Sequence, residues 1–253
     1  MEPANKDRIS ALLKSIETGD PGPIAVVNEA KYIQHNPQTH EGSDGLAVLF
    51  ARLSKTNPRV NIVRAFEDGD FVFAHTEYDF SRRNIGFEVF RFEDGQAVEH
   101  WDNIQPRLGP NPSGRSMVDG PVEATDLDDT EANRERVREF IDTVLIGRDL
   151  DRLQDFVSPD YAEHNPGMRD GLPELRQVLS AEGGGRPSVL YERLHRVLAE
   201  GSFVLSVSEG QRDGVHTSFY DLFRLADGMM VEHWDTTEKI APKSEWKNDN
   251  GKF

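Results

Sequence analysis

The hexapeptide Tyr32–Pro37 (YIQHNP) fixes the interpretation of the chain, because it returns in the second half as Tyr161–Pro166 (YAEHNP). The tetrapeptide Glu99–Asp102 (EHWD) returns in the same order, at nearly the same spacing, as Glu232–Asp235. The segment between these two motifs also repeats at an intermediate spacing. Chance explains one shared tetrapeptide but not several in the same order at nearly constant spacing. The sequence therefore predicts a tandem duplication.

The duplication settles the domain organisation of a chain of 253 residues, a length that suits one large domain or two small ones. The stretch between the copies is rich in proline and glycine and cannot hold a regular ladder of backbone hydrogen bonds. We expect a first domain over residues 1–105, a linker over 106–130, a second domain over 131–241 and a polar tail over 242–253.

Each copy shows a helical pattern followed by a strand pattern. Apolar residues at helical spacing predict three helices at the start of each copy, the third near residues 46–53 in the first copy and 172–179 in the second. Strands are predicted at 60–66, 71–78, 85–92 and 97–104, with Asp-Gly pairs as hairpin turns. Helices first and a mostly antiparallel sheet afterwards predict an α+β unit in which the sheet wraps the helices.

The composition excludes several classes of protein. A net charge of −16 argues against binding to nucleic acids or to anionic membranes. Polar N-terminal residues and the lack of a long apolar run predict a cytoplasmic protein. The chain has no cysteine, so disulfides, thiolate nucleophiles and thiolate metal ligands are excluded.

The repeated strings resemble the SnoaL-like, polyketide-cyclase-like branch of the NTF2-like (cystatin-like) superfamily. They are Tyr32–Pro37, the Asp-Gly-Asp-Phe-Val string at residues 68–72 and the run from Phe90 to Asp102, and the resemblance covers both copies. It implies two cone-shaped units, each with three helices packed on a curved sheet. It also implies acid–base chemistry without a metal or an organic cofactor, such as aldol-type cyclisation or isomerisation of a small hydrophobic carbonyl compound.

Strand alternation sorts the polar residues of each copy into two faces. His100 and Asp102 share one face of the last strand, whereas Glu99 and Trp101 share the other. The resemblance places a catalytic carboxylate on the terminal strands. The predicted catalytic residues are Asp102, Asp235, His35, His164, His75, Glu88 and Asp221. The predicted ligand-binding residues are Tyr32, Asn36, His100, Trp101, Tyr161, Asn165, His233 and Trp234. No metal ligands are predicted.

Structural roles stay open for the same residues. The His-Asn-Pro element can cap neighbouring backbone groups, Asp102 can pair with Arg91, and Trp101 can pack in the core. His75 has no counterpart histidine, since Val207 occupies that place in the second copy. The alternative function is therefore a non-catalytic binding or scaffold protein of the same superfamily. We also expect the two sheets to pack face to face, as an intrachain pseudo-dimer that can in turn form a homodimer.

Overall fold

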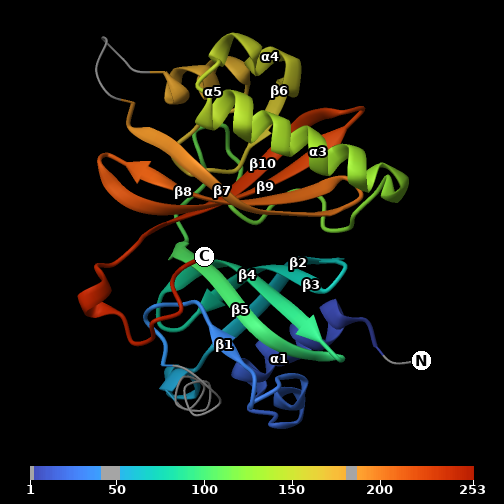
Figure 1. The fold of residues 1–253 in the computed structure, drawn as a ribbon, viewed down its shortest axis with the longest axis vertical. Helices are drawn as coiled ribbons and strands as arrows, with labels where there is room; N and C mark the ends of the chain where they lie inside the picture. The colour runs from blue at the N-terminus through green and yellow to red at the C-terminus, as the bar shows by residue number, and fades with distance from the viewer. Residues whose placement is uncertain (1–2, 41–51, 181–186) are drawn as a thin grey trace. The chain divides into compact units, whose positions relative to one another are not determined.

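A computed structural model describes residues 3–40, 52–180 and 187–253 of the chain. It divides into two compact units (Figure 1). Unit 1 consists of Met1–Arg107 together with the C-terminal segment Ile240–Phe253, and unit 2 consists of Leu108–Lys239. The proline-rich segment after the first copy thus belongs to unit 2, and the C-terminal tail belongs to unit 1.

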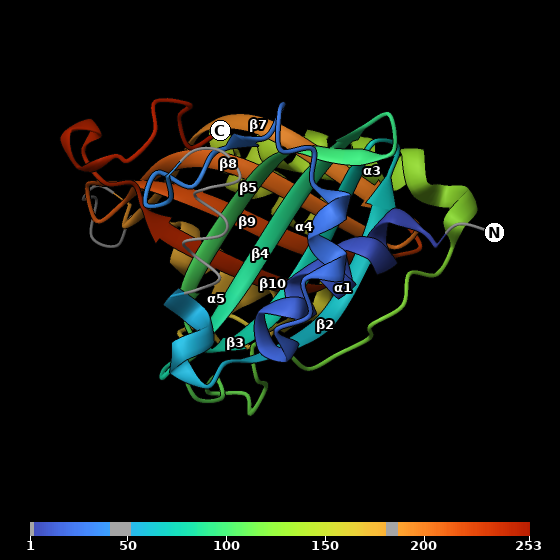
Figure 2. The same ribbon diagram turned by 90° about the horizontal axis from the view of Figure 1, so that it is seen from below.

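Unit 1 is a helix-covered sheet with the strand order β1-β5-β4-β3-β2. The helix α1 packs on β2 and β3, and Figure 2 shows it lying across the sheet. The elements are α1 (Asn5–Thr18), the 3₁₀ turns η1 (Gly22–Val26) and η2 (Ser54–Thr56), and the strands β1 (Ile33–Gln34), β2 (Arg59–Asp68), β3 (Phe71–Asp79), β4 (Arg83–Glu93) and β5 (Gln96–Pro106).

Unit 2 repeats this plan with the strand order β6-β10-β9-β8-β7. Its helical elements are η3 (Leu127–Asp129), α3 (Thr130–Phe140), the π-helical η4 (Ile141–Ile146), η5 (Leu150–Arg152), α4 (Leu153–Phe156) and α5 (Leu172–Leu179). Its strands are β6 (Val157–Glu163), β7 (Val189–Glu200), β8 (Phe203–Arg212), β9 (Val215–Ala226) and β10 (Met229–Lys239); the tail adds η7 (Lys243–Glu245) to unit 1.

The predicted α+β class and the four long strands of each copy are confirmed. The hairpins turn at Asp94-Gly95 and Asp227-Gly228, where both residues of each pair have positive φ, as a tight two-residue turn requires. Helix α5 confirms the third helix of the second copy. Its counterpart near residues 46–53 lies mostly outside the described residues. Within the described residues, no helix is both long and apolar enough to cross a membrane.

One parallel strand in each unit, β1 or β6, was not predicted. The residues that precede each His-Asn-Pro motif pair in parallel with the last strand, so that Gln34 lies opposite His100 and Glu163 lies opposite His233. The proline that ends each motif cannot extend this pairing, because it lacks a backbone N–H. The sheet is therefore mixed, and the parallel strand carries a polar side chain to the histidine of the neighbouring strand.

The core of each unit lies between the helices and one face of the sheet. In unit 1, Ile9, Leu12 and Ile16 of α1 pack with Val72 and Phe90 of the sheet. In unit 2 the corresponding cluster joins Val137, Phe140 and Val144 of the helical layer to strand residues such as Phe223. These side chains recur at helical spacing on the helices and at every second residue on the strands, which is why the two elements bury them together.

The C-terminal tail is bound to the back of the His-Asn-Pro segment of unit 1. The Asn248 amide donates hydrogen bonds to the carbonyls of Asn36 and Thr39, at 2.8 and 2.9 Å. Lys252 Nζ donates to the carbonyl of Asp102 at 2.7 Å. Unit 2 uses the segment after the first copy in the same way, because the Asn111 amide donates to the carbonyl of Glu163 at 2.6 Å.

We expect the substitution Asn248→Ala to loosen the loop of residues 34–39 without affecting unit 2. Two buried hydrogen bonds are lost, each worth about 1 kcal/mol. Amide hydrogen exchange should therefore speed up locally around these residues. The matched substitution Asn111→Ala should instead speed up exchange next to Glu163. Identical exchange patterns in the two variants would contradict this assignment of the two segments.

Candidate active site

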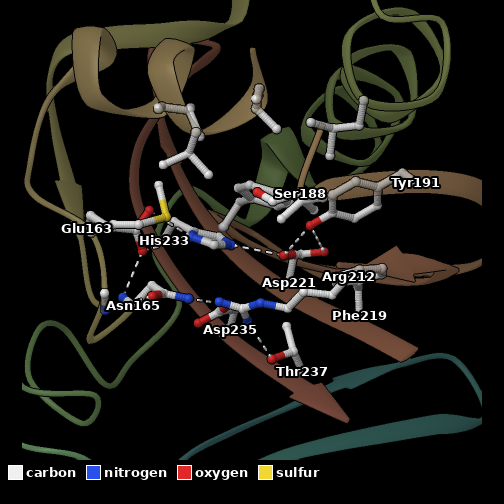
Figure 3. Close-up of a pocket in the computed structure, with 18 of the residues that line it drawn as sticks. Glu163, Asn165, Ser188, Tyr191, Arg212, Phe219, Asp221, His233, Asp235 and Thr237 are labelled. Atoms are coloured by element: carbon white, nitrogen blue, oxygen red, sulfur yellow. Dashed lines mark hydrogen bonds and ion pairs between the residues drawn. The ribbon is translucent and has the colours of Figure 1, made fainter. Parts of the chain in front are cut away.

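Unit 2 encloses a cavity of ≈ 290 Å³ between its helices and its sheet (Figure 3). Its walls are apolar and include Phe140, Leu175, Leu179, Phe219 and Phe223. Its polar side chains come from the strands of the sheet and from their connecting loops, and they are Tyr161, Glu163, Asn165, Ser188, Tyr191, Arg212, Asp213, Asp221, His233, Asp235 and Thr237. The cavity thus combines an apolar body with a compact cluster of ionisable groups, as small-molecule sites do.

His233 is held between two carboxylates. Its Nδ1 lies 3.0 and 3.1 Å from the two carboxylate oxygens of Glu163, and its Nε2 lies 3.1 Å from Asp221 Oδ1. Burial disfavours the charged ring, but the charge of Glu163 and the hydrogen bonds of both carboxylates raise the pKa of His233 well above 6.5. At neutral pH the ring is therefore an imidazolium.

The contacts of Glu163 decide which group is the donor and which the acceptor in each hydrogen bond of the cluster. Its Oε1 accepts the backbone N–H groups of His164 and Asn165, at 2.9 and 2.8 Å. It therefore acts as an acceptor, and Nδ1 of His233 donates to it. Nε2 and Asp221 then share a second proton, and the Tyr191 hydroxyl lies 3.1 Å from Asp221 Oδ1. Burial raises the pKa of Tyr191 well above 10, so the hydroxyl stays protonated and donates to the carboxylate.

Asp235 lies two residues beyond His233 on the same face of β10. Its Oδ2 accepts a hydrogen bond of 2.6 Å from the Asn165 amide. Burial raises the pKa of Asp235 from 3.8 to about 6; the positive charge of His233 partly offsets this effect, whereas Glu163 and Asp221 add to it. A carboxyl group with this pKa exchanges protons readily near neutrality, which is the requirement for a general acid–base catalyst.

Unit 1 has a corresponding cavity of ≈ 220 Å³. Its polar lining includes Tyr32, Asn36, Glu88, His100 and Asp102. His100 Nε2 lies 2.8 Å from Glu88 Oε2, and the Asn36 amide donates to Asp102 Oδ2 at 2.7 Å. The two cavities therefore share a histidine, a carboxylate that contacts it, and a second carboxylate held by an asparagine.

The charge of the cluster differs between the units, because Gln34 takes the place of Glu163. Gln34 Oε1 accepts the Asn36 backbone N–H at 2.9 Å and lies 3.0 Å from His100 Nδ1. The backbone bond shows that the oxygen faces His100, so Nδ1 again donates. Unit 1 also brings in Lys252, whose Nζ lies 3.7 Å from Asp102 Oδ1. One negative charge is thus missing from the first cluster, and one positive charge lies beside it.

A tyrosine contacts the histidine-bound carboxylate in both units, but from different strands. In unit 1 the Tyr78 hydroxyl of β3 lies 2.8 Å from Glu88 Oε1. In unit 2 the tyrosine is on the neighbouring strand, where Tyr191 of β7 is paired with Gly210. In unit 1 the tyrosine is on the other strand of the corresponding pair, because Tyr78 of β3 lies opposite Val60 of β2. A Cβ at Gly210 would come within 1.9 Å of the Leu190 carbonyl, so no larger residue fits there.

The two histidines of the His-Asn-Pro motifs lie outside the linings of these cavities. His35 stacks on Trp101 with ring centroids 4.7 Å apart, and its Nε2 contacts Glu99 at 2.8 Å. His164 makes the equivalent stack on Trp234 and contacts Glu232 at 2.8 Å. Strand alternation explains this placement, because the histidines and tryptophans point away from the face that carries His100 and His233.

His75 also lies outside the cavity lining of unit 1. Its ring packs against Phe87, with centroids 4.8 Å apart, on the face of the sheet opposite Val72 and Ala74. Arg91 pairs with Glu99 at 2.6 Å and not with Asp102, so the open pairing of Asp102 is resolved. The structure thus brings together Tyr32, Asn36, Glu88, His100 and Asp102, and in unit 2 Tyr161, Asn165, Asp221, His233 and Asp235.

Four polar residues of the clusters were missed by the sequence analysis: Gln34, Glu163, Tyr78 and Tyr191. A signal for the first two was present, because Tyr161, Glu163 and Asn165 alternate as one face of a strand does. The tyrosines have no such signal, since they occupy different strands in the two copies.

A metal would find its best set of ligands in unit 1. One donor atom from each of Glu88, His100 and Asp102 lies within 4.8 Å of the others, in the part of the chain that the structure describes. Each side chain already has a partner in the cluster, however. A cation would have to replace the proton between His100 and Glu88, whose hydrogen bond is 2.8 Å.

These features define the class: an α+β unit in which helices cover a five-stranded mixed sheet, present twice, with a buried histidine–carboxylate cluster in each copy. The SnoaL-like domain matches residues 9–100 and 137–233, which together make up most of the chain. The chain therefore belongs to the SnoaL-like family and contains two copies of its domain.

Three solved structures similar to this chain each match less than half of it. TsrD from Streptomyces laurentii is 20% identical, with 40% of this chain and 87% of that chain covered and a TM-score of 0.35. A protein from Kribbella flavida proposed to be a ketosteroid isomerase is 17% identical (45% and 83% covered, TM-score 0.39). An epoxide hydrolase of the LEH-like type from M. tuberculosis is 21% identical (44% and 85%, TM-score 0.36). No curated protein matches the chain.

We expect the substitution Glu163→Gln to lower the pKa of His233. Attraction to Glu163 is the largest of the effects that raise this pKa, and the variant reproduces the glutamine found at Gln34. Nitrogen-15 NMR of the imidazole rings measures the change directly. In the wild type, His233 should remain an imidazolium above pH 6.5. A wild-type ring that is already neutral at that pH would contradict the assignment.

Proposed function

We propose that this chain is a cofactor-independent enzyme that performs acid–base chemistry on a small hydrophobic carbonyl compound. The reaction type is aldol-type condensation or cyclisation, or isomerisation. The observation that carries the proposal is the placement of Asp235 and His233 on one strand face, inside a cavity with apolar walls. A base and a fixed positive charge then lie on the same side of a bound substrate.

In the proposed mechanism Asp235 acts as the base. Its ionised form removes a proton from the carbon next to the substrate carbonyl, and the electron pair of that C–H bond forms an enolate. The imidazolium of His233 stabilises the negative charge electrostatically, while Glu163 and Asp221 keep the ring protonated and oriented. The protonated Asp235 then returns the proton, either to another carbon in an isomerisation or to the alkoxide formed in an aldol step.

Asn165 and Tyr191 are positioning residues in this scheme. The Asn165 amide holds one oxygen of Asp235 and so fixes the orientation of the carboxyl group. Tyr191 holds Asp221 against His233. We place the reaction first in unit 2, where the pKa of Asp235 is raised to about 6, and assign Asp102 and His100 the corresponding roles in unit 1. His35, His164, Trp101 and Trp234 support the other side of the strands in this proposal.

The substitution Asp235→Asn should abolish turnover in unit 2 and yet increase stability at pH 7. The fold favours the protonated carboxyl, so the stability that this group contributes is lost as the pH rises from 3.8 through about 6. Replacing the carboxylate should raise the free energy of unfolding at pH 7 by about 1–3 kcal/mol. The gain should vanish near pH 4, and thermal or urea unfolding at both pH values measures it.

Asp102→Asn is the matched control, because Asp102 faces the buried ammonium of Lys252. Removing that negative charge should destabilise unit 1. Turnover of carbonyl compounds should be tested for the two variants singly and together. If both single variants and the double variant keep the wild-type rate on a compound that the wild type converts, the proposal is wrong.

The face-to-face pseudo-dimer of the two sheets stays a prediction, as does a homodimer of the whole chain. Small-angle X-ray scattering of the protein should give the envelope of one compact body. An envelope with two separated units would contradict the pseudo-dimer.

A further inference from the structure

The mouths of the two cavities differ at two corresponding pairs of positions. Counted from the first residue of the matching strands β3 and β8, Phe80 of unit 1 stands where unit 2 has Arg212. Counted from the His-Trp pairs of β5 and β10, Ile104 likewise stands where unit 2 has Thr237. All four residues line their cavities. An apolar pair in unit 1 is thus replaced by a cationic and a hydroxyl side chain in unit 2.

Arg212, at the end of β8, is held at the mouth by a residue of β10, which lies two strands away in the sheet. Its guanidinium donates a hydrogen bond of 3.0 Å to Thr237 Oγ1, and Figure 3 shows the side chain extending from the end of β8 toward Asp235 and Thr237. Within residues 3–40, 52–180 and 187–253 the guanidinium has no other hydrogen-bonding partner. Most of its N–H donors therefore remain available to a ligand. In unit 1, Phe80 instead stacks on Tyr78, with centroids 5.0 Å apart.

The charges of the cavity restrict where a negative group of a ligand can lie. Glu163, Asp221 and Asp235 line the interior and outnumber the single positive charge of His233, so an anion is repelled there. Arg212 is the arginine of the lining, and the exposed Asp213 that follows it in sequence also lines the cavity. A ligand with one negative charge can therefore place this charge at the mouth and its apolar part against the phenylalanines and leucines of the wall. In a ligand with several negative charges, the charges not bound by Arg212 would lie near the carboxylates of the cavity and be repelled by them.

We propose that Arg212, held by Thr237, is an anion-binding subsite that selects amphipathic monocarboxylates for the cavity of unit 2. The planar guanidinium matches a carboxylate with two parallel hydrogen bonds, which a phenylalanine at this position cannot offer. The inference rests on one part of the proposed function, namely that the cavity binds a small molecule. It does not require that the bound molecule is converted. It deepens that function by naming the substrate class: a hydrophobic carbonyl compound that carries a carboxylate at one end.

Binding of 4-phenylbutanoate and of its uncharged methyl ester to the full chain tests this inference, with NMR titration as the readout. The wild type should bind the acid saturably, with perturbed amide signals around residues 212 and 237. In Arg212→Phe, the residue found in unit 1, the affinity for the acid should fall about fivefold or more, and that for the ester should change little. Arg212→Lys should retain part of the preference.

Arg52→Gln is the control, because Arg52 is an exposed arginine that lines the cavity of unit 1. Loss of acid binding in Arg52→Gln but not in Arg212→Phe would overturn the inference. Equal losses of the acid and the ester in Arg212→Phe, or no saturable binding of the acid to the wild type, would overturn it too. Asp235→Asn separates the two proposals, since it should abolish turnover in unit 2 but keep acid binding there.

Discussion

A buried imidazole ring held on both sides by side-chain acceptors is the interaction on which each unit depends. In unit 2, His233 of β10 joins Glu163 at the end of β6 to Asp221 of β9. Glu163 in turn accepts two backbone N–H groups of the turn that follows. Burying a charged ring is costly unless opposite charges surround it, so neither carboxylate can be removed without consequences. The same contacts that position the proposed catalytic groups therefore also fix the unpredicted parallel strand to the sheet.

The two copies keep this arrangement by different means. The tyrosine that contacts the histidine-bound carboxylate comes from β3 in unit 1 and from β7 in unit 2. In unit 2 the position that corresponds to Tyr78 is Gly210, where a larger residue would clash with the backbone of β7. The C-terminal tail supports the His-Asn-Pro segment of unit 1, and the segment after the first copy supports that of unit 2. The contact between a tyrosine and the histidine-bound carboxylate is thus kept although different strands supply the tyrosine, which argues that the contact matters in both units.

The sequence indicates most of the fold and about half of the site. Repeated strings and strand alternation correctly predict that His100 and Asp102 share a face that Trp101 does not. The role of Glu163 was missed because the proline that ends the motif suggested a corner and not the parallel strand that precedes it. His35 and His164 attract attention as repeated histidines, but burial of a stacked ring explains them equally well, and only three-dimensional packing distinguishes these roles. Tail docking depends on amide hydrogen bonds between segments near opposite ends of the chain, which no local pattern reveals.

Hydrogen–deuterium exchange at carbon is the most direct test of the central claim, because it reports the proposed proton transfer without the natural substrate. The protein is incubated with an apolar methyl ketone in D₂O, and deuterium at the carbons next to the carbonyl is followed by NMR. The account predicts saturable exchange above the buffer rate, rising with pH through about 6 as Asp235 ionises. Exchange at the buffer rate, with the ketone shown to bind in the cavity of unit 2, would contradict it and favour a binding protein.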